Sequence, residues 1–250
     1  MQGGIPAARW WAGAGARAAF AALAAAAIVL PALAASFSVT PVRIYMRPQD
    51  RAMAVTITNE SDAPVVLQAD IYNWTQKPDG TDELALSEDL ILSPPIIKLG
   101  PKARQVVRLA RLMPPDATRQ LTYRLIMREV PEATAPKDNI QVTIALALSM
   151  PVFITPPPAK RQITCDASRG EQSTLNVGCA NTGSAYAQVR EVLVKDGERV
   201  LGRFEGGAYI LPGARKVLPI KAENITPGAR LQLIVSYDDG RSDSFDVTVG

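Results

Sequence analysis

Residues 139–150 read NIQVTIALALSM, and this stretch says more about the fold than any other. Large apolar side chains occupy every second position from Ile140 to Met150, with smaller or polar residues between them. Because successive side chains of an extended chain point to opposite faces, the pattern predicts one long strand with an apolar face, ended by Pro151. If this face lay on an uncovered sheet edge, it would promote aggregation. It is therefore either buried in the protein's own core or donated to a partner protein.

The same alternation recurs in shorter runs along the chain. These runs are 52–58, 65–74, 105–111 and 121–130, then 162–166, 175–181, 187–195, 215–220, 230–237 and 241–249. Turn-forming residues separate them, and Asp-Gly pairs mark tight hairpins within the later set. Since almost no stretch after residue 35 has helical periodicity, the chain is predicted to be all-β and built from sandwiches.

Two features predict how the chain is divided. Arg9 and Arg17 precede an uncharged apolar stretch at 18–30 and a tract of small residues, which predicts a signal peptide at 1–35 and export from the cytoplasm. An uncleaved anchor is the alternative, although a bilayer span needs about 20 apolar residues. Three prolines then suit a stiff linker at 156–160, between a first domain at 36–155 and a second at 161–250.

The composition removes most catalytic and nucleic-acid functions. There is no histidine, and hence no Ser-His-Asp arrangement and no usual transition-metal ligand. The formal net charge of +3 falls by two, to +1, once Arg9 and Arg17 leave with the leader, so charge does not favour nucleic acid. No phosphate-binding loop is present. We therefore expect no enzyme activity, metal or cofactor, although spacing alone leaves open a carboxylate pair of the glycosidase type.

Cys165 and Cys179 are the only cysteines. In an exported chain we expect them to form one disulfide across neighbouring strands, which stabilises the second domain. The alternative is a pair of buried free thiols.

A series of motifs resembles the PapD-like family of periplasmic pilus-assembly chaperones. The resemblance covers nearly all of the first domain, and the second domain matches only in size and in SYDDG at 236–240. The motifs are SVTPVRIYM at 38–46, VTITNES at 55–61, WTQKPDG at 74–80, SPPIIKLGPKARQVVRL at 93–109, YRLIMREVP at 123–131 and PVFITPP at 151–157.

The resemblance implies a fold, a partner and a location. The fold is two immunoglobulin-like sandwiches set at an angle, and the last strand of the first is donated to a pilus subunit that lacks its own final strand. The chaperone then delivers the subunit to an outer-membrane usher, without stable membrane insertion. Independently of the resemblance, an uncovered strand on the free protein predicts capping by a second copy. The residues that match the family's donor positions most closely are Val142, Ile144 and Leu146, and Ile140 and Leu148 extend the set.

Two arginines are implied to bind the carboxylate at the end of the subunit chain. Arg43 matches the family's cleft arginine, and a guanidinium fork suits a carboxylate. The lysine that accompanies it in the best-known members is replaced by Pro151, so Arg124 is the candidate substitute. The alternatives are an ordinary exposed arginine at 43 and a solvated strand arginine at 124.

Other positions depart from the family pattern. Thr155 replaces a buried arginine whose acidic partners match Glu129 and Asp238, so we expect a different link between the domains. Lys102 stands where a Pro-Gly turn is usual, which argues against a type II turn. Trp74 is expected simply to pack against the core. These departures resemble the non-classical branch that serves spore-coat-like or archaic pili.

Two other functions remain in competition with the chaperone. One is a secreted structural or adhesive immunoglobulin-like protein whose strand at 139–150 is buried in the core of the same molecule. The other is a secreted enzyme that uses carboxylates, which requires a concave pocket holding two of them.

Overall fold

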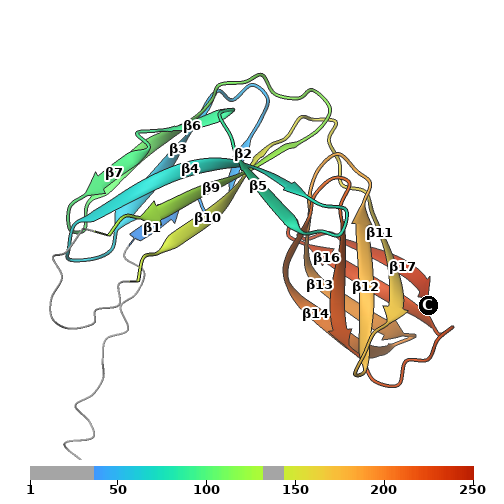
Figure 1. Ribbon diagram of the computed structural model, residues 1–250. Coiled ribbons are helices and arrows are strands. Elements are labelled where there is room, and N and C mark those ends of the chain that lie inside the picture. The colour runs from blue at the N-terminus through green and yellow to red at the C-terminus, as the bar shows by residue number, and fades with distance from the viewer. Residues whose placement is uncertain (1–36, 132–143) are drawn as a thin grey trace, which may run out of the picture. The chain divides into compact units, whose positions relative to one another are not determined.

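The described part of the chain, residues 37–131 and 144–250 of a computed structural model, forms 17 strands and no helix (Figure 1). The all-β prediction is therefore confirmed. No helix in these two ranges is long and apolar enough to cross a membrane. The predicted signal peptide lies outside the described residues.

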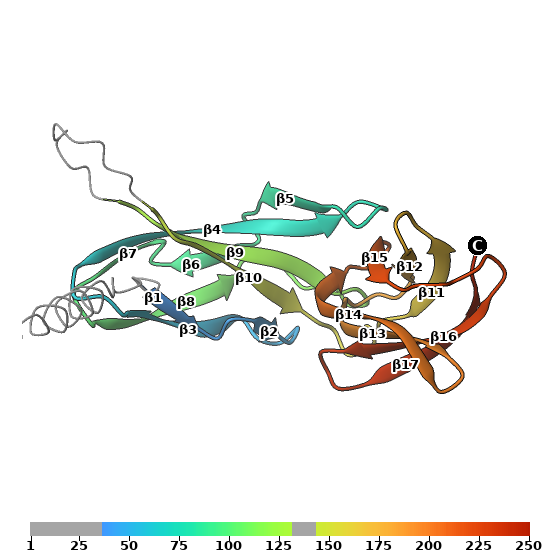
Figure 2. The ribbon, with the colours of Figure 1, turned by 90° about the horizontal axis from the view of Figure 1, so that it is seen from below.

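The first sandwich is made of two sheets, which form two layers in Figure 2. In spatial order, sheet A contains β1 (Phe37–Thr40), β3 (Ala52–Asn59), β8 (Arg104–Arg111) and β6 (Leu90–Ser93). Sheet B contains β2 (Ile44–Met46), β10 (Ala147–Ile154), β9 (Leu121–Glu129), β4 (Val65–Gln76) and β5 (Asp82–Leu86), and β7 (Ile96–Leu99) pairs with the start of β4.

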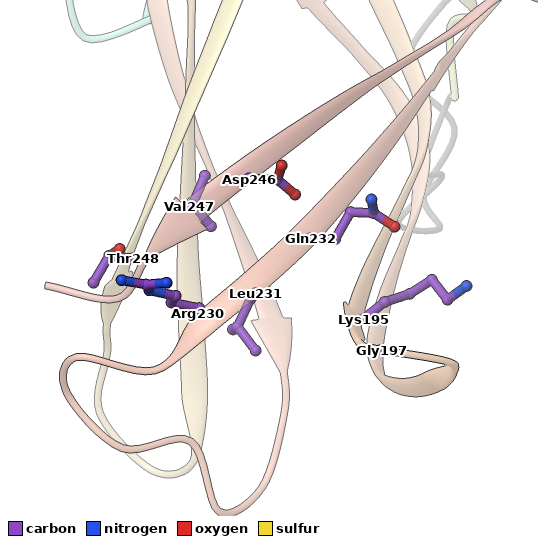
Figure 3. Close-up of a pocket in the computed structure, with 8 residues that line it drawn as sticks. All are labelled: Lys195, Gly197, Arg230, Leu231, Gln232, Asp246, Val247 and Thr248. Atoms are coloured by element: carbon purple, nitrogen blue, oxygen red, sulfur yellow. The ribbon is translucent and has the colours of Figure 1, made fainter.

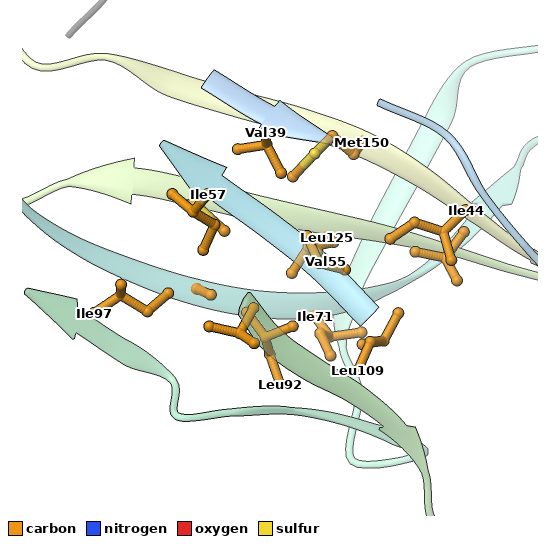
Figure 4. Close-up of a cluster of buried hydrophobic side chains, with 14 of the residues drawn as sticks. Val39, Ile44, Val55, Ile57, Ile71, Leu92, Ile97, Leu109, Leu125 and Met150 are labelled. Atoms are coloured by element: carbon orange, nitrogen blue, oxygen red, sulfur yellow. The ribbon is translucent and has the colours of Figure 1, made fainter. Parts of the chain in front are cut away.

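Alternate apolar residues of these strands fill the space between the two sheets. Along β4 and β9 buried positions alternate with more exposed ones, as expected for strands with one face on a core. Figure 4 shows side chains from both sheets pointing toward one another, among them Ile57 of β3, Ile71 of β4, Leu109 of β8 and Leu125 of β9. The periodicity of the sequence thus becomes a closed apolar layer.

The second sandwich also has two sheets. Sheet C contains β11 (Ile163–Arg169), β12 (Thr174–Asn181) and β15 (Arg215–Lys221); sheet D contains β14 (Arg199–Ile210), β13 (Ala187–Asp196), β16 (Arg230–Tyr237) and β17 (Ser242–Thr248). Cys165 lies directly opposite Cys179 in the β11–β12 pair, and the two form a disulfide. The predicted disulfide is therefore confirmed.

The strand predicted at 139–150 differs from the strand observed. Residues 139–143 lie outside the described residues, 144–146 are not in a strand, and β10 runs from Ala147 through Pro151 to Ile154. The prediction that Pro151 ends it was wrong. At Pro151 the strand is paired only with β9, because pairing with β2 begins at Val152, and a proline is tolerated where one edge of a strand is free.

A buried asparagine ends one strand in each sandwich. Asn59 is the last residue of β3, and Asn181 is the last residue of β12. Each Nδ2 donates a hydrogen bond of 2.8 Å to the carbonyl oxygen of the alanine four residues later. Each Oδ1 accepts the backbone N–H two residues later, at 2.9 Å and 3.0 Å. The two sandwiches thus share a turn that no repeat in the sequence suggests.

The turn at Lys102 corrects a second expectation. Lys102 has a φ of +54°, and the N–H of Ala103 donates to the carbonyl of Gly100 at 3.1 Å. A positive φ after Pro101 is the feature of a type II turn, which the sequence had argued against. The Lys102 ammonium donates to the carbonyl of Glu60 at 2.6 Å, which helps a non-glycine residue hold this conformation.

Candidate functional site

One half of β10 is an open edge of sheet B. β9 pairs with β10 along its whole length, from Ala147 to Ile154, whereas β2 pairs with it only from Val152 onward. Within the described residues, the backbone of 147–151 therefore has a strand on one side only. Free N–H and C=O groups along such an edge can pair with an added strand.

The apolar residues leading into β10 become more buried along the chain. Ile144 is 87% exposed, Leu146 and Leu148 are partly buried against the core of the first sandwich, and Met150 is 4% exposed. Of the five predicted donor residues, Leu148 lies on this open edge, and Ile144 and Leu146 lie in the segment just before β10. The other two, Ile140 and Val142, lie outside the described residues.

A groove of about 390 Å³ lies between the open half of β10 and β1, the edge strand of sheet A. Its walls come from Phe37, Val39 and Val42 on one side and from Leu148 and Met150 on the other. Figure 4 shows Val39 and Met150 on neighbouring strands at this edge. Val42 is 70% exposed, so the groove is apolar yet open to solvent.

Arg43, just before β2, bonds to the second sandwich. Its Nη1 donates to Oδ2 of Asp238 at 2.9 Å, and the two side chains are 30% and 15% exposed. Tyr186 donates to the same oxygen at 3.0 Å and lies 2.9 Å from the hydroxyl of Tyr45. Burial lowers the pKa of Arg43, but hydrogen bonding to Tyr45 and nearby negative charge outweigh it, so the pKa is raised. Arg43 is thus a partly buried, paired cation.

Arg124 lies on β9, directly opposite Pro151 of β10. Its guanidinium stacks 3.7 Å from the ring centre of Trp74 and 5.4 Å from that of Tyr209. Within the described residues no carboxylate lies within ion-pair distance of it. Burial lowers its pKa, and the charge of Asp82 opposes this only in part. Because a desolvated cation is stabilised by a counter-ion, Arg124 is suited to bind an anion.

The two arginines come from the two strands that pair with β10. Arg124 pairs directly with Pro151, and Arg43 immediately precedes Ile44, which pairs with Val152. Side chains of directly opposed residues share one face of a sheet. Burial raises the pKa of Tyr209, and the positive charges of Arg43 and Arg124 both oppose that rise.

An aromatic cluster joins the two sandwiches beside the arginines. Trp74 of β4 and Phe153 of β10 are fully buried with Leu211, and Tyr186 and Tyr209 pack against them. The rings of Phe153 and Tyr186 stack with centres 4.0 Å apart. Trp74 is packed, as expected, but in this cluster and not in the core of the first sandwich.

Neutral hydrogen bonds occur where the sequence suggested an altered link between the domains. The Gln120 amide donates to the hydroxyl of Thr155 at 2.6 Å and accepts the backbone N–H of Tyr186 at 2.9 Å. Gln76 likewise accepts the N–H of Leu211 at 2.8 Å and donates to the carbonyl of Tyr209 at 3.1 Å. An amide bridge therefore occupies the region where an arginine at 155 would lie.

A second hollow, of about 620 Å³, lies at the end of the second sandwich and contains none of the predicted site residues (Figure 3). It is formed by the β13–β14 hairpin with β16 and β17, and its charged groups are Lys195, Arg230 and Asp246. With charges of both signs it favours no class of ligand.

The sequence interpretation missed several contributors to the site. The groove residues Phe37 and Val39, and the supports Trp74, Tyr186 and Tyr209, were not assigned to it. Only one signal could have been used. The alternation in SVTPVRIYM places Arg43 and Tyr45 on one face of an extended segment. Arg43 bonds to Asp238, and Tyr45 bonds to the hydroxyl of Tyr186, which itself donates to Asp238.

Residues 36–160 match the family described as pili and flagellar-assembly chaperone, PapD N-terminal domain. No curated protein sequence matches the chain. At the identities found among solved structures, the likeness concerns the fold.

Three of the similar structures are chaperones or a complex that contains one. A chain of the CsuC–CsuE chaperone–tip adhesion subunit pre-assembly complex, from archaic Csu pili of Acinetobacter baumannii, is 18% identical with a TM-score of 0.63, over 86% of this chain and 100% of that one. The E. coli chaperone DraB is 16% identical with a TM-score of 0.56, over 86% and 97%. The Pseudomonas aeruginosa chaperone CupB2 is 19% identical with a TM-score of 0.52, over 85% and 100%.

Proposed function

Because this chain belongs to the PapD-like family of pili and flagellar-assembly chaperones, we propose that it binds pilus subunits in the periplasm by donating a strand, and then delivers them to an outer-membrane usher. The single observation that carries the proposal is the uncovered apolar segment that leads into β10, in which Ile144 is 87% exposed. The working domains are 36–155 and 161–250, and no catalysis is required of them.

Donation satisfies both partners physically. A subunit without its last strand exposes core side chains and unpaired backbone groups. The donated segment covers the core with apolar side chains and pairs the backbone groups through its own N–H and C=O groups. Its apolar side chains are Ile140, Val142, Ile144, Leu146 and Leu148. Each side chain that becomes buried contributes about 1.5–3 kcal/mol before ordering costs. The groove beside β1 lets the same edge accept an apolar side chain of the subunit in return.

The carboxylate at the end of the subunit chain anchors the register of this pairing. Arg124 pairs with Pro151 and Arg43 immediately precedes the partner of Val152, so we expect one carboxylate to contact both guanidiniums. The lysine missing at Pro151 is replaced by Arg124 from the neighbouring strand. When no subunit is bound, a second copy of the chain covers the same open edge, which predicts a self-associated free protein.

The test is recovery of a complex from the periplasm after co-expression with subunits encoded beside the gene. Ile144→Asp should abolish recovery, because a lost contact of about 1.5–3 kcal/mol lowers affinity roughly ten- to a hundredfold and an unpaired charge lowers it further. Ala145→Asp is the matched control, since it adds the same charge to the opposite, exposed face. Undiminished recovery with Ile144→Asp would reject strand donation. Size measurement of the free protein tests self-association in the same samples.

A further inference from the structure

Asp238 already fills the position of a bound carboxylate at Arg43. It lies in the turn after β16, and its Oδ2 accepts from Arg43 at 2.9 Å and from the Tyr186 hydroxyl at 3.0 Å. Since the single hydroxyl hydrogen of Tyr186 is directed to Asp238, Tyr45 must donate to Tyr186 across their 2.9 Å contact. Asp238 is thus held by a chain of donors from both sandwiches.

Arg43 and Arg124 differ in how their positive charges are neutralised. Arg43 is paired with Asp238, whereas Arg124 has no carboxylate within ion-pair distance in the described part of the chain and is held by the faces of Trp74 and Tyr209. Asp238 neutralises Arg43, whereas the positive charge of Arg124 is opposed, in the same part of the chain, only by the carboxylate of Asp82, which lies beyond ion-pair distance. An arriving carboxylate is therefore attracted to Arg124, and near Arg43 it meets the like charge of Asp238.

We propose that Asp238 is an internal competitor for Arg43. A carboxylate at the end of a bound chain binds first at Arg124 and gains Arg43 only by displacing Asp238, which gives up a bond between the sandwiches. The inference rests on the proposed function, since it concerns the carboxylate site of that function. It adds a residue that weakens binding of the terminus and couples it to contact between the sandwiches.

The first experiment uses the full mature chain with N-acetyl-alanyl-phenylalanine, as the free carboxylate and as the C-terminal amide, titrated by NMR. Asp238→Asn keeps the size of the side chain and removes its charge. It should tighten binding of the carboxylate about five- to tenfold, as expected for removing a like charge at a few ångströms in a partly solvated site, and leave the amide unchanged.

The matched control is Asp239→Asn. It makes the same change one residue later, where the carboxylate pairs with Arg161 at 2.5 Å within the second sandwich and does not touch Arg43. Its binding of both probes should equal that of the parent. Unchanged or weaker binding of the carboxylate by Asp238→Asn overturns the proposal, because Asp238 would then position Arg43 and not compete for it.

A second measurement uses the unmodified protein, so it does not depend on whether a variant folds. The carboxyl carbon resonance of Asp238 should shift when the carboxylate probe binds, and should not shift with the amide. A constant resonance at saturation overturns displacement. Neither result bears on strand donation, which is judged separately by Ile144→Asp and recovery of the subunit complex.

Discussion

Shortening the side chains that lead into and along β10 should destabilise the protein in graded steps. Met150 is 4% exposed, and truncation of a buried methionine to alanine costs about 2–5 kcal/mol. Leu148 is partly buried against the same core, so Leu148→Ala should cost about 1–2 kcal/mol. Ile144 is 87% exposed, so Ile144→Ala should change the free energy of unfolding by no more than about 0.5 kcal/mol.

Urea unfolding followed by circular dichroism measures this series, provided that the dependence on urea stays the same between variants. The order Met150, Leu148, Ile144 is expected because one strand passes from the closed core to an uncovered edge. If Ile144→Ala is as destabilising as Met150→Ala, the apolar face is buried within its own molecule. The reasoning on strand donation then fails, and the structural or adhesive interpretation replaces it.

Three further outcomes follow from contacts elsewhere. Replacing Cys165 and Cys179 together by serine should lower the free energy of unfolding by about 3 kcal/mol, since the bridge closes a loop of 14 residues; an unchanged urea midpoint would contradict this. Asn59→Ala and Asn181→Ala should each cost about 2–4 kcal/mol by leaving buried carbonyl groups unpaired, and a pair of neutral results would show that water replaces the amides. Four tyrosines have pKa values raised chiefly by burial, so the stability that their neutral form confers is present below about pH 10 and is lost as pH rises above it. Tyrosinate absorbance should therefore appear together with unfolding, and ionisation in the folded protein would count against the burial; the four are Tyr123, Tyr186, Tyr209 and Tyr237.

The longer strands of regular alternation were predictable both inside a sheet and, as with β15 and β17, at its edge, whereas the short edge strands of the first sandwich were not. The limits of β3, β8, β9 and β16 differ from the predicted runs by one residue or less, because alternation there is enforced by a core. The short edge strands β1, β2, β5, β6 and β7, and the long β14, were missed. β1, β2, β5, β6 and β7 have only three to five residues, too few for alternation to be recognised, and three glycines interrupt the pattern of β14.

Only part of the candidate site could be identified from the sequence. Ile144, Leu146 and Leu148 were identifiable from the periodicity, and Arg43 and Arg124 from the resemblance and its missing lysine. The partners of the arginines were not identifiable. Asp238 lies 195 residues after Arg43, and Trp74 reaches Arg124 only because β4 and β9 are neighbours in sheet B.

The sequence by itself determined the all-β class, the apolar face that leads into β10 and the disulfide, because period-two alternation and a single pair of cysteines after a predicted signal peptide can be read without the fold. Only the tertiary structure decided which side chains of that face are covered, which edge of β10 is open, and which arginine already has a carboxylate. Those facts depend on strand order and on contacts between residues far apart in the chain. No local pattern encodes them, because the same alternating strand can lie at the centre or at the edge of a sheet.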